Sequence, residues 1–251
     1  MTGGQGPDSG LIYADGNLQS VTIGGDLTGA SVTGTTSVNI SGAIEAVDHI
    51  GSVLIKGSII AGSNGGTGTL VNSGAIFSDT ADIGSITVMH NIVGNATASV
   101  DIAAVGPLVK PASGYDLAIG SLTVDGSVSY VNVQAGFSGD GATPANANAS
   151  IGSIIVKGNW SASNAVAGAV QNSAPDWGLG DTLQSGGAIN QPATIESIVI
   201  GGYLTGAVTS SQDFGFVAQT FNSISIGGHL ISLTPGAIPQ AQAGNVYLEV
   251  V

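Results

Sequence analysis

The sequence contains no cysteine and no arginine, and only 8% of its 251 residues carry a charge. Without cysteine there are no disulfides and no thiolate metal ligands, and the redox compartment stays open. Because charged residues usually make up about a quarter of a chain, Ser, Thr, Asn, Gly and Ala must cover much of the outer surface. The composition is not that of a disordered chain, since 43% of it is hydrophobic and the aliphatic residues recur periodically.

The few charges that are present are mostly acidic. Sixteen acids oppose three lysines, which gives a formal net charge of −13. Nucleic-acid binding needs a basic footprint and is therefore excluded. Anionic lipid is disfavoured for the same reason, and an anionic polysaccharide would need a bridging cation. No apolar run reaches the roughly 18 residues of a membrane helix, so we expect no membrane insertion.

One ten-residue segment, Ile119–Val128 (IGSLTVDGSV), recurs along the chain and organises it. The serine at its third position marks seven copies: Ser20, Ser52, Ser85, Ser121, Ser153, Ser197 and Ser223. Successive markers are 32, 33, 36, 32, 44 and 26 residues apart. A near-constant period with variable insertions is typical of a solenoid, in which one turn cannot bury its apolar face alone.

Apolar residues fill fixed positions around each marker, two residues before it and one, three and seven after it. In the second turn the first three are Ile50, Val53 and Ile55, and they follow the alternating pattern of a β-strand. Glycine stands five residues after the marker in six of seven turns, as Gly57 does, and predicts a bend. The position seven after the marker holds Leu27, Ile59, Ile92, Val128, Trp160, Leu204 and Leu230.

A second strand pattern lies about half a turn further on. Ser37–Ile44 (SVNISGAI) is matched 32 residues later by Leu70–Ile76, and Ser99–Ile102 and Val131–Val133 continue the series. Strands that recur once per turn in one direction pair in parallel with the next turn. The sequence therefore predicts an all-β fold, a parallel β-helix (solenoid) of about seven turns of roughly 32 residues with loop insertions. At roughly 4.8 Å between paired strands, its core is about 33 Å long.

The domain organisation follows from this pattern. Residues 1–10 are Gly-rich and predict a flexible lead, and residues 11–251 predict a single β-helix domain. Two insertions interrupt it, near residues 136–150 and 171–193. Loops of such length often carry function.

The position two residues after the marker should face outward. It holds Leu54, Ile155 and Val199, which are unusual for open solvent, as well as Thr22, Thr87 and Thr123. These aliphatic residues are either scattered surface residues, which are normal, or a face covered by another subunit or by the long insertion. Since Ile155 and Val199 lie on adjacent turns, we take the three aliphatic residues as a candidate assembly face.

The sequence gives little support for a metal site or a catalytic site. His49, His90 and His229 occupy different columns, so they predict no zinc site. The acids are dispersed rather than clustered as in glycosidases, and Asp side chains that are close in sequence commonly form turns. We therefore expect no catalytic residue, no metal site and no cofactor. Calcium is the ion that the composition suits better, since Asp, Asn and carbonyl oxygens are its usual ligands, and the segment from Asp176 to Asp181 is the first place to look.

The two tryptophans have different expected places. Trp160 occupies an apolar column and should lie in the core. Trp177 stands in a polar loop between Pro175 and Gly178, where it either anchors its own loop or contacts a sugar or a partner. We take Trp177, with Asp176 and Asp181, as a candidate ligand or partner contact.

The segments 21–29 (VTIGGDLTG), 122–128 (LTVDGSV) and 198–206 (IVIGGYLTG) resemble repeats of large exported bacterial β-helix proteins, such as adhesins and passenger-like surface proteins. The resemblance covers most of the chain. It implies a right-handed helix, an extracellular or cell-surface setting and a structural or adhesive role. It names no catalytic residue.

Three functions follow as hypotheses. The first is a non-enzymatic extracellular β-helix that self-associates into a fibre, filament or surface layer through its ends or the Leu54, Ile155 and Val199 face. The second is a β-helix that binds or cleaves polysaccharide through the loops at 136–150 and 171–193. The third is an ice- or surface-binding solenoid that uses the threonine column, which Leu54 interrupts.

Overall fold

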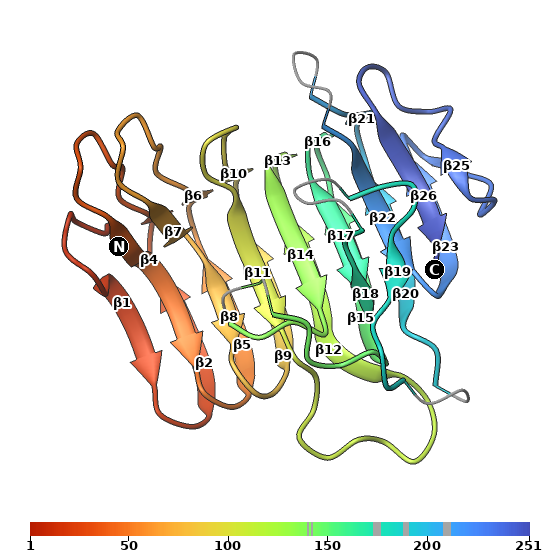
Figure 1. Cartoon of the computed structure of the whole chain (residues 1–251), viewed down its shortest axis with the longest axis horizontal. Coiled ribbons are helices and arrows are strands. Elements are labelled where there is room, and N and C mark those ends of the chain that lie inside the picture. Colours follow the sequence, from red (N-terminus) through yellow and green to blue (C-terminus); the bar gives the residue numbers. More distant parts are fainter. Residues whose placement is uncertain (140, 142, 173–176, 188–190, 208–211) are drawn as a thin grey trace.

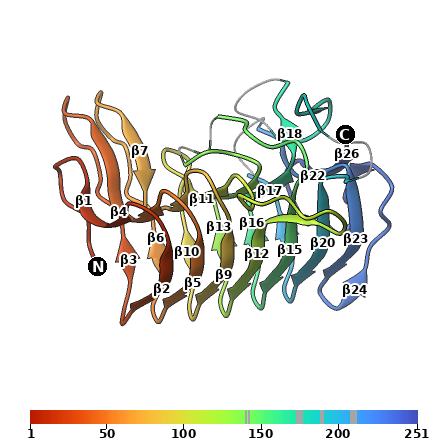
Figure 2. The same ribbon diagram turned by 90° about the horizontal axis from the view of Figure 1, so that it is seen from below.

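The computed structural model describes residues 1–139, 141, 143–172, 177–187, 191–207 and 212–251. Over these residues the protein is all-β, with parallel strands stacked in about seven turns of a β-solenoid. Figures 1 and 2 show the strands side by side along the molecule, with the two termini towards opposite ends. The described residues form no helix that could cross a membrane. The predicted fold class is confirmed.

Three parallel sheets form the wall of the solenoid and are numbered in the order in which the chain reaches them. Sheet 1 contains β1 (Ser9–Ala14), β4 (Val38–Ala46), β8 (Ile76–Ser78), β11 (Val100–Ala104), β14 (Val131–Ala135), β17 (Asn164–Ala167), β22 (Phe214–Ala218), β26 (Val246–Val250) and β25 (Gly236–Ala237), with β7 (Leu70–Ser73) beside β4. Sheet 2 contains β2 (Leu18–Ile23), β5 (Ile50–Ile55), β9 (Ile83–Val88), β12 (Asp116–Val124), β15 (Ala149–Val156), β20 (Thr194–Ile200), β23 (Thr220–Ile226) and β24 (His229–Leu230). Sheet 3 contains β3 (Leu27–Thr28), β6 (Ile59–Ile60), β10 (Ile92–Val93), β13 (Val128–Ser129), β16 (Trp160–Ser161) and β21 (Leu204–Thr205). A separate antiparallel pair consists of β18 (Ala169–Val170) and β19 (Thr182–Leu183).

The marker serines pair with one another through the whole of sheet 2, from Ser20 with Ser52 to Ser197 with Ser223. The alternation expected around them is wrong at one point. Ile50 and Val53 are three residues apart, so strict alternation would place them on opposite faces, yet both are buried. Two residues, Gly51 and Ser52, lie between them, and the ladder passes from the Ile50 pair directly to the Ser52 pair. This irregularity keeps both aliphatic side chains in the core.

The predicted glycine bends connect sheet 2 to sheet 3. A Cβ at Gly158 would lie 2.7 Å from the carbonyl oxygen of Gly126, so close stacking of the turns requires glycine there. The residues that follow this column from Asp26 to Asn159 each accept, with their side chain, a hydrogen bond from a backbone N–H of the next turn. The backbone N–H of Ser127 donates to Asn91 Oδ1 at 2.8 Å, and that of Asn159 donates to Ser127 Oγ at 3.0 Å. The bends are therefore stacked in register from turn to turn.

The core lies between the three sheets and consists of the predicted apolar columns. Trp160 is fully buried, as predicted, and its ring meets that of Phe216 at a centroid distance of 5.7 Å. One prediction is wrong: Leu230 is 78% exposed. Gly227 and Gly228 have φ values of 58° and 80°, which suit a two-residue hairpin turn. The chain therefore turns back, and β24 pairs antiparallel with β23 instead of beginning another strand of sheet 3.

The tail covers the C-terminal edges of the other two sheets as well. Strand β25 pairs antiparallel with β26, and Ala241 forms a bridge with Leu204 of β21. At the other end, Thr2 forms an isolated parallel bridge with Thr28 of β3. Ser9 and Gly10 already belong to β1 of sheet 1.

The two insertions pack on the outer face of sheet 1. Phe137 and Trp177 belong to a second apolar cluster there, together with Val166 and Val217 of the underlying strands. The rings of Phe137 and Trp177 meet edge to face, with centroids 6.0 Å apart. The described parts of both loops thus cover the sheet with apolar side chains.

The second strand pattern contains two registers rather than one. Val38 pairs with Leu70, as the sequence suggests. Ile102, however, continues the column of Ile44 and Ile76. The predicted alignment of Ile102 with Ile40 is therefore wrong. The segments 29–40 and 61–72 are additional chain before the corner of sheet 1, and β7 extends beyond the position where β11 begins. This difference between the second and third turns creates one wall of the site described next.

Candidate functional site

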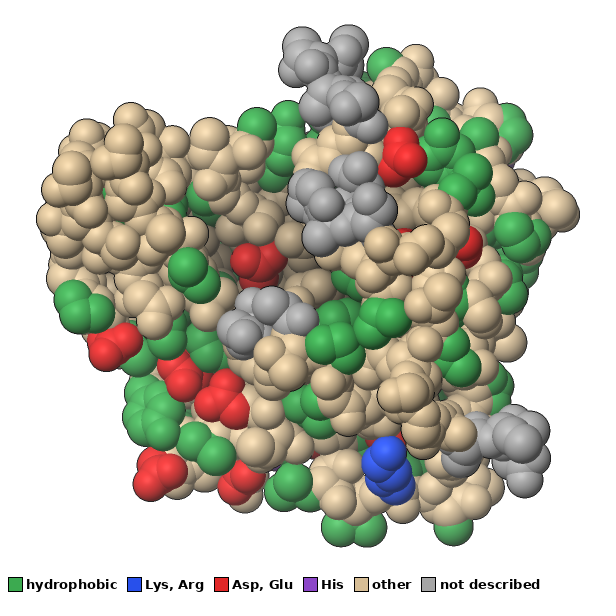
Figure 3. Space-filling view, in the orientation of Figure 1, with side chains coloured by type: hydrophobic (Ala, Val, Ile, Leu, Met, Phe, Trp, Pro, Cys, Tyr) green, Lys and Arg blue, Asp and Glu red, His purple; other side chains and the backbone are tan. Residues whose placement is uncertain are grey.

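A groove lies on the outer face of sheet 1, between the lobe formed by the first turns and the body of the molecule. Figure 3 shows the hollow with an acidic side chain in it. The groove has a volume of about 330 Å³. Its lining residues come from five successive turns: Leu70–Ser73, Asn95–Ser99, Asp101, Tyr130, Asn132, Ala162, Asn164, Gln212 and Phe214.

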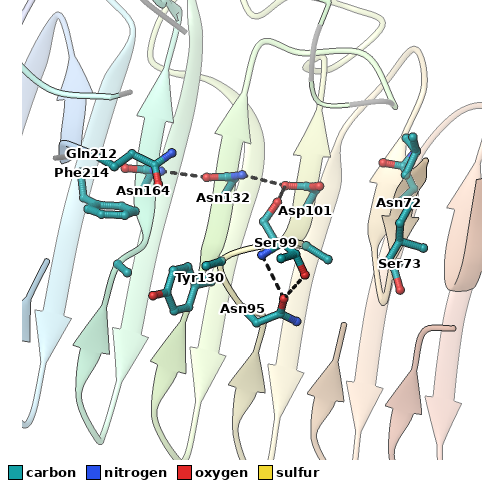
Figure 4. A pocket seen from close by; sticks show the side chains of 16 residues that line it. Asn72, Ser73, Asn95, Ser99, Asp101, Tyr130, Asn132, Asn164, Gln212 and Phe214 are labelled. Atoms are coloured by element: carbon teal, nitrogen blue, oxygen red, sulfur yellow. Dashed lines mark hydrogen bonds between the residues drawn. The ribbon is translucent and has the colours of Figure 1, made fainter. Parts of the chain in front are cut away.

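A hydrogen-bonded row of polar side chains forms the floor (Figure 4). Asp101, Asn132 and Asn164 face outward from neighbouring strands, where Asp101 pairs with Asn132 and Asn132 with Asn164. Asn164 Nδ2 donates to Asn132 Oδ1, and Asn132 Nδ2 donates to Asp101 Oδ1, each at 2.8 Å. The backbone N–H of Gly215 donates to Asn164 Oδ1 at 2.9 Å. All these donors point the same way, towards a carboxylate.

Asp101 is the acidic end of this row. Ser99 Oγ also donates to its Oδ1, at 2.9 Å. Burial among protein atoms raises the pKa of Asp101, and the hydrogen bonds from Asn132 and Ser99 lower it in part. Both described hydrogen bonds go to Oδ1, so the acceptor capacity of Oδ2 remains for another group.

The walls contribute an amide on one side and aromatic rings on the other. Asn72 of β7 is 7% exposed, and its Oδ1 has no hydrogen-bond partner among the described residues. In Figure 4, Asn72 lies beyond the Asp101 end of the row, Phe214 lies beside Asn164 at the other end, and Tyr130 lies below the row. Asn72, near the end of β7, and Tyr130, directly before β14, both have φ near 50°. This backbone conformation therefore places both side chains along the groove.

The predicted contact at Trp177 lies elsewhere. Trp177 is 4% exposed, so its ring anchors the insertion on sheet 1 and offers almost no surface to a ligand. Asp181 accepts hydrogen bonds from the backbone N–H groups of Asn172, at 3.2 Å, and Gly178, at 3.0 Å. This is the turn-forming role expected of aspartate. Asp176 lies outside the described residues.

The predicted assembly face is split by the register of sheet 2. Ile155 and Val199 pair directly and are 37% and 38% exposed. Leu54 pairs with Thr87, and Thr87 and Thr123 separate it from Ile155. The structure thus brings two of the three aliphatic side chains together and leaves Leu54 three strands away.

A pair of carboxylates lies on sheet 1, apart from the groove. Glu45 is hydrogen-bonded to Asp79, and its pKa is raised to about 7 by burial, by the charge of Asp79, by that hydrogen bond and by the charge of Asp8. Glycosidase carboxyl groups stand about 5 Å or more apart, so that substrate or water fits between them. Two carboxyl groups in direct contact instead share a proton.

In the described part of the chain, no three His, Asp or Glu side chains lie close enough together to hold a metal ion. His49 Nδ1 lies 3.0 Å from Asp82 Oδ2, which places this histidine in a pair between turns. Asp125 and Lys157, which stand four residues after the markers Ser121 and Ser153, form an ion pair between adjacent turns at 2.7 Å. Such an exposed pair contributes at most about 1 kcal/mol.

Sequence reasoning missed the groove, although its signal was present. Asp101 and Asn132 occupy the middle of the segments Val100–Ile102 and Val131–Val133, which served only to recognise a strand. Their flanking residues point inward, so both polar side chains point outward on adjacent turns. The walls could not be foreseen, because they depend on how far segments 61–72 and 212–214 project.

Comparison with known proteins returns no match: no protein-family model, no curated protein and no solved structure matches the chain significantly. The functional argument therefore depends on the geometry of the chain itself.

Proposed function

We propose that this chain is a non-enzymatic structural or adhesive β-solenoid that acts outside the cell or at the cell surface. Adhesin-like and passenger-like β-helix proteins, which its repeats resemble, provide the model for this role. The supporting observation is the common register of the repeat columns in sheet 2, which pair from β2 to β23; the one register shift along them lies between Leu117 and Ile119, at the start of β12. A wall that is hydrogen-bonded between every pair of turns makes a stiff unit, as a scaffold requires.

Self-association is the second part of the proposal, and it uses the exposed pair Ile155 and Val199. The pair belongs to an outward column of uncharged side chains on sheet 2, and exposed apolar side chains gain free energy by leaving water. At the C-terminal end the chain's own tail covers the strand edges of all three sheets. Pairing through those edges would have to displace the tail, so we favour lateral contact between copies.

Electron microscopy of the purified chain at high concentration, with and without calcium, tests this proposal. Ordered filaments, sheets or side-by-side rods are expected in both conditions, because the proposed contact is apolar. Isolated short rods in both conditions would contradict self-association. Assembly only when calcium is present would indicate that acidic side chains, rather than Ile155 and Val199, form the contact.

A further inference from the structure

We propose that the groove on sheet 1 is a binding site for a neutral glycan. This inference deepens the adhesive part of the proposed function and rests on it. It concerns sheet 1, whereas self-association concerns sheet 2, so each can fail without the other.

The shape of the groove suits a short piece of a polymer. Its volume of about 330 Å³ falls at the lower end of the range for small-ligand sites, which is about 300–1,000 Å³. The row of side chains on its floor spans three adjacent strands, and the lining continues over five turns. A few sugar units lying along the stacking direction would meet a new polar side chain at each strand.

The hydrogen-bonding capacity that remains on the floor is matched to hydroxyl groups. Asn132 and Asn164 each use one N–H in the row, so each keeps a second N–H. Asp101 keeps Oδ2 as an acceptor. A sugar hydroxyl both donates and accepts, and neighbouring hydroxyls can therefore bridge an amide N–H and the carboxylate. Hydrogen bonds to a charged acceptor are the stronger ones.

The walls provide the two other features of a sugar site. Tyr130 offers an aromatic ring with a polar tip, against which the C–H face of a pyranose can pack. The Asn72 amide has its Oδ1 unpaired, and exchanging the two ends of the amide would leave its donors in that position instead. The protein alone does not fix this amide, so a bound hydroxyl or water would determine its orientation.

The charges of the groove favour a neutral ligand. No lysine lines it, and the chain contains no arginine. An acidic glycan would bring its carboxylates against Asp101 with no counter-charge. A calcium ion requires six to eight oxygen ligands, often several carboxylates. The groove offers one carboxylate, and the Oδ1 atoms of its row already accept hydrogen bonds.

The row could in principle serve only to hold the strands in register. The stacked side chains at the bends do that already, and they close on backbone N–H groups. The row on sheet 1 instead borders a cavity and ends on a carboxylate with a spare oxygen. A row that only holds the strands in register needs neither a neighbouring cavity nor a spare carboxylate oxygen.

Titration of the ¹⁵N-labelled full chain, followed by NMR, tests the proposal. The probes are neutral cello-, malto-, manno- and N-acetylglucosamine oligosaccharides, with oligogalacturonate and calcium chloride as separate arms. At least one neutral series should shift the side-chain NH₂ signals of Asn132 and Asn164. Shifts there with oligogalacturonate or calcium only, or with none of the probes, would overturn the proposal.

Two variants locate the binding. Asp101→Asn keeps the shape of the row and removes the carboxylate, so affinity should fall about 10- to 100-fold, as expected for loss of a charge-assisted hydrogen bond. Tyr130→Ala removes the ring and should also weaken binding. Asp125→Asn, which removes an acid from the Lys157 pair instead, should leave affinity unchanged. Unaltered affinity in both groove variants, with the fold intact by circular dichroism, would refute the site.

Sedimentation of the same samples separates the two proposals. Assembly without glycan binding leaves the structural role standing and overturns the groove. Glycan binding by a strictly monomeric chain overturns self-association. The groove and the adhesive role then stand.

Discussion

At the scale of single residues, Glu45 shows how packing on the outer wall changes an ionisation. Burial and the neighbouring Asp79 raise its pKa from the usual 4.5 to about 7. The folded protein therefore holds a proton that the unfolded chain has already released between these pH values. Stability contributed by this site is present below about pH 4.5 and is lost as the pH rises through about 7.

Replacement of Glu45 by Gln removes that pH dependence. At pH 8 the free energy of unfolding of Glu45→Gln should exceed that of the original chain by on the order of 1 kcal/mol, a figure reduced for solvent screening of a partly hydrated carboxyl. At pH 4.5 the two should be equal. Urea unfolding at both pH values measures the difference. Glu196→Gln on sheet 2 is the control, and an equal gain in both variants at pH 8 would contradict the account.

Single site residues were the least predictable part of the molecule. The sequence placed Trp160 in the core, because its position belongs to a regular apolar column. Trp177 lies in an insertion, and its burial depends on Phe137, which is 40 residues away along the chain. Contacts between two irregular loops leave no periodic signal in a sequence.

At the scale of elements, the bend between sheets 2 and 3 depends on how closely successive turns stack. An added Cβ at Gly158 would collide with Ser127 and with the carbonyl of Gly126. At Gly25, in the same column of the first turn, it would meet no atom within 4 Å. The two glycines are therefore equivalent in the repeat and different in their surroundings.

Alanine at these two positions should have opposite consequences. Gly158→Ala should destabilise the protein by about 1–3 kcal/mol, because the turns must move apart. Gly25→Ala should be neutral or stabilising by up to about 1 kcal/mol, because it restricts the unfolded chain. Urea unfolding followed by far-UV circular dichroism compares them. Equal losses would mean that the bend needs glycine for its backbone angles rather than for space.

The boundaries of the strands were predictable within the regular repeats and not at the C-terminal end of the solenoid, where the repeats stop. The strands of sheet 2 follow from columns that recur in all seven turns. The cap formed by β24 and β25 does not, because Gly227 and Gly228 reverse a strand whose apolar pattern would otherwise continue to Leu230. The corners of sheet 1 were missed too, since additional chain in the first two turns changes the register of Ile40.

At the scale of the whole molecule, the solenoid separates its faces. Sheet 1 carries the groove and the packed insertions, sheet 2 carries Ile155 and Val199, and sheet 3 forms the remaining wall. Because each turn contacts mainly its neighbours, a change on one face leaves the others intact. Assembly and ligand binding can therefore be tested by separate substitutions.

The central claim is that copies of the chain associate through sheet 2, and sedimentation velocity over a concentration series tests it most directly. Val199→Asp places a charge in the proposed contact. Val93→Asp is the matched control on sheet 3, since Val93 and Val199 are the same residue type and both are 38% exposed. The account predicts that the original chain and Val93→Asp form larger species as concentration rises, while Val199→Asp stays monomeric. Equal behaviour of the two variants, whether both assemble or neither does, would contradict it.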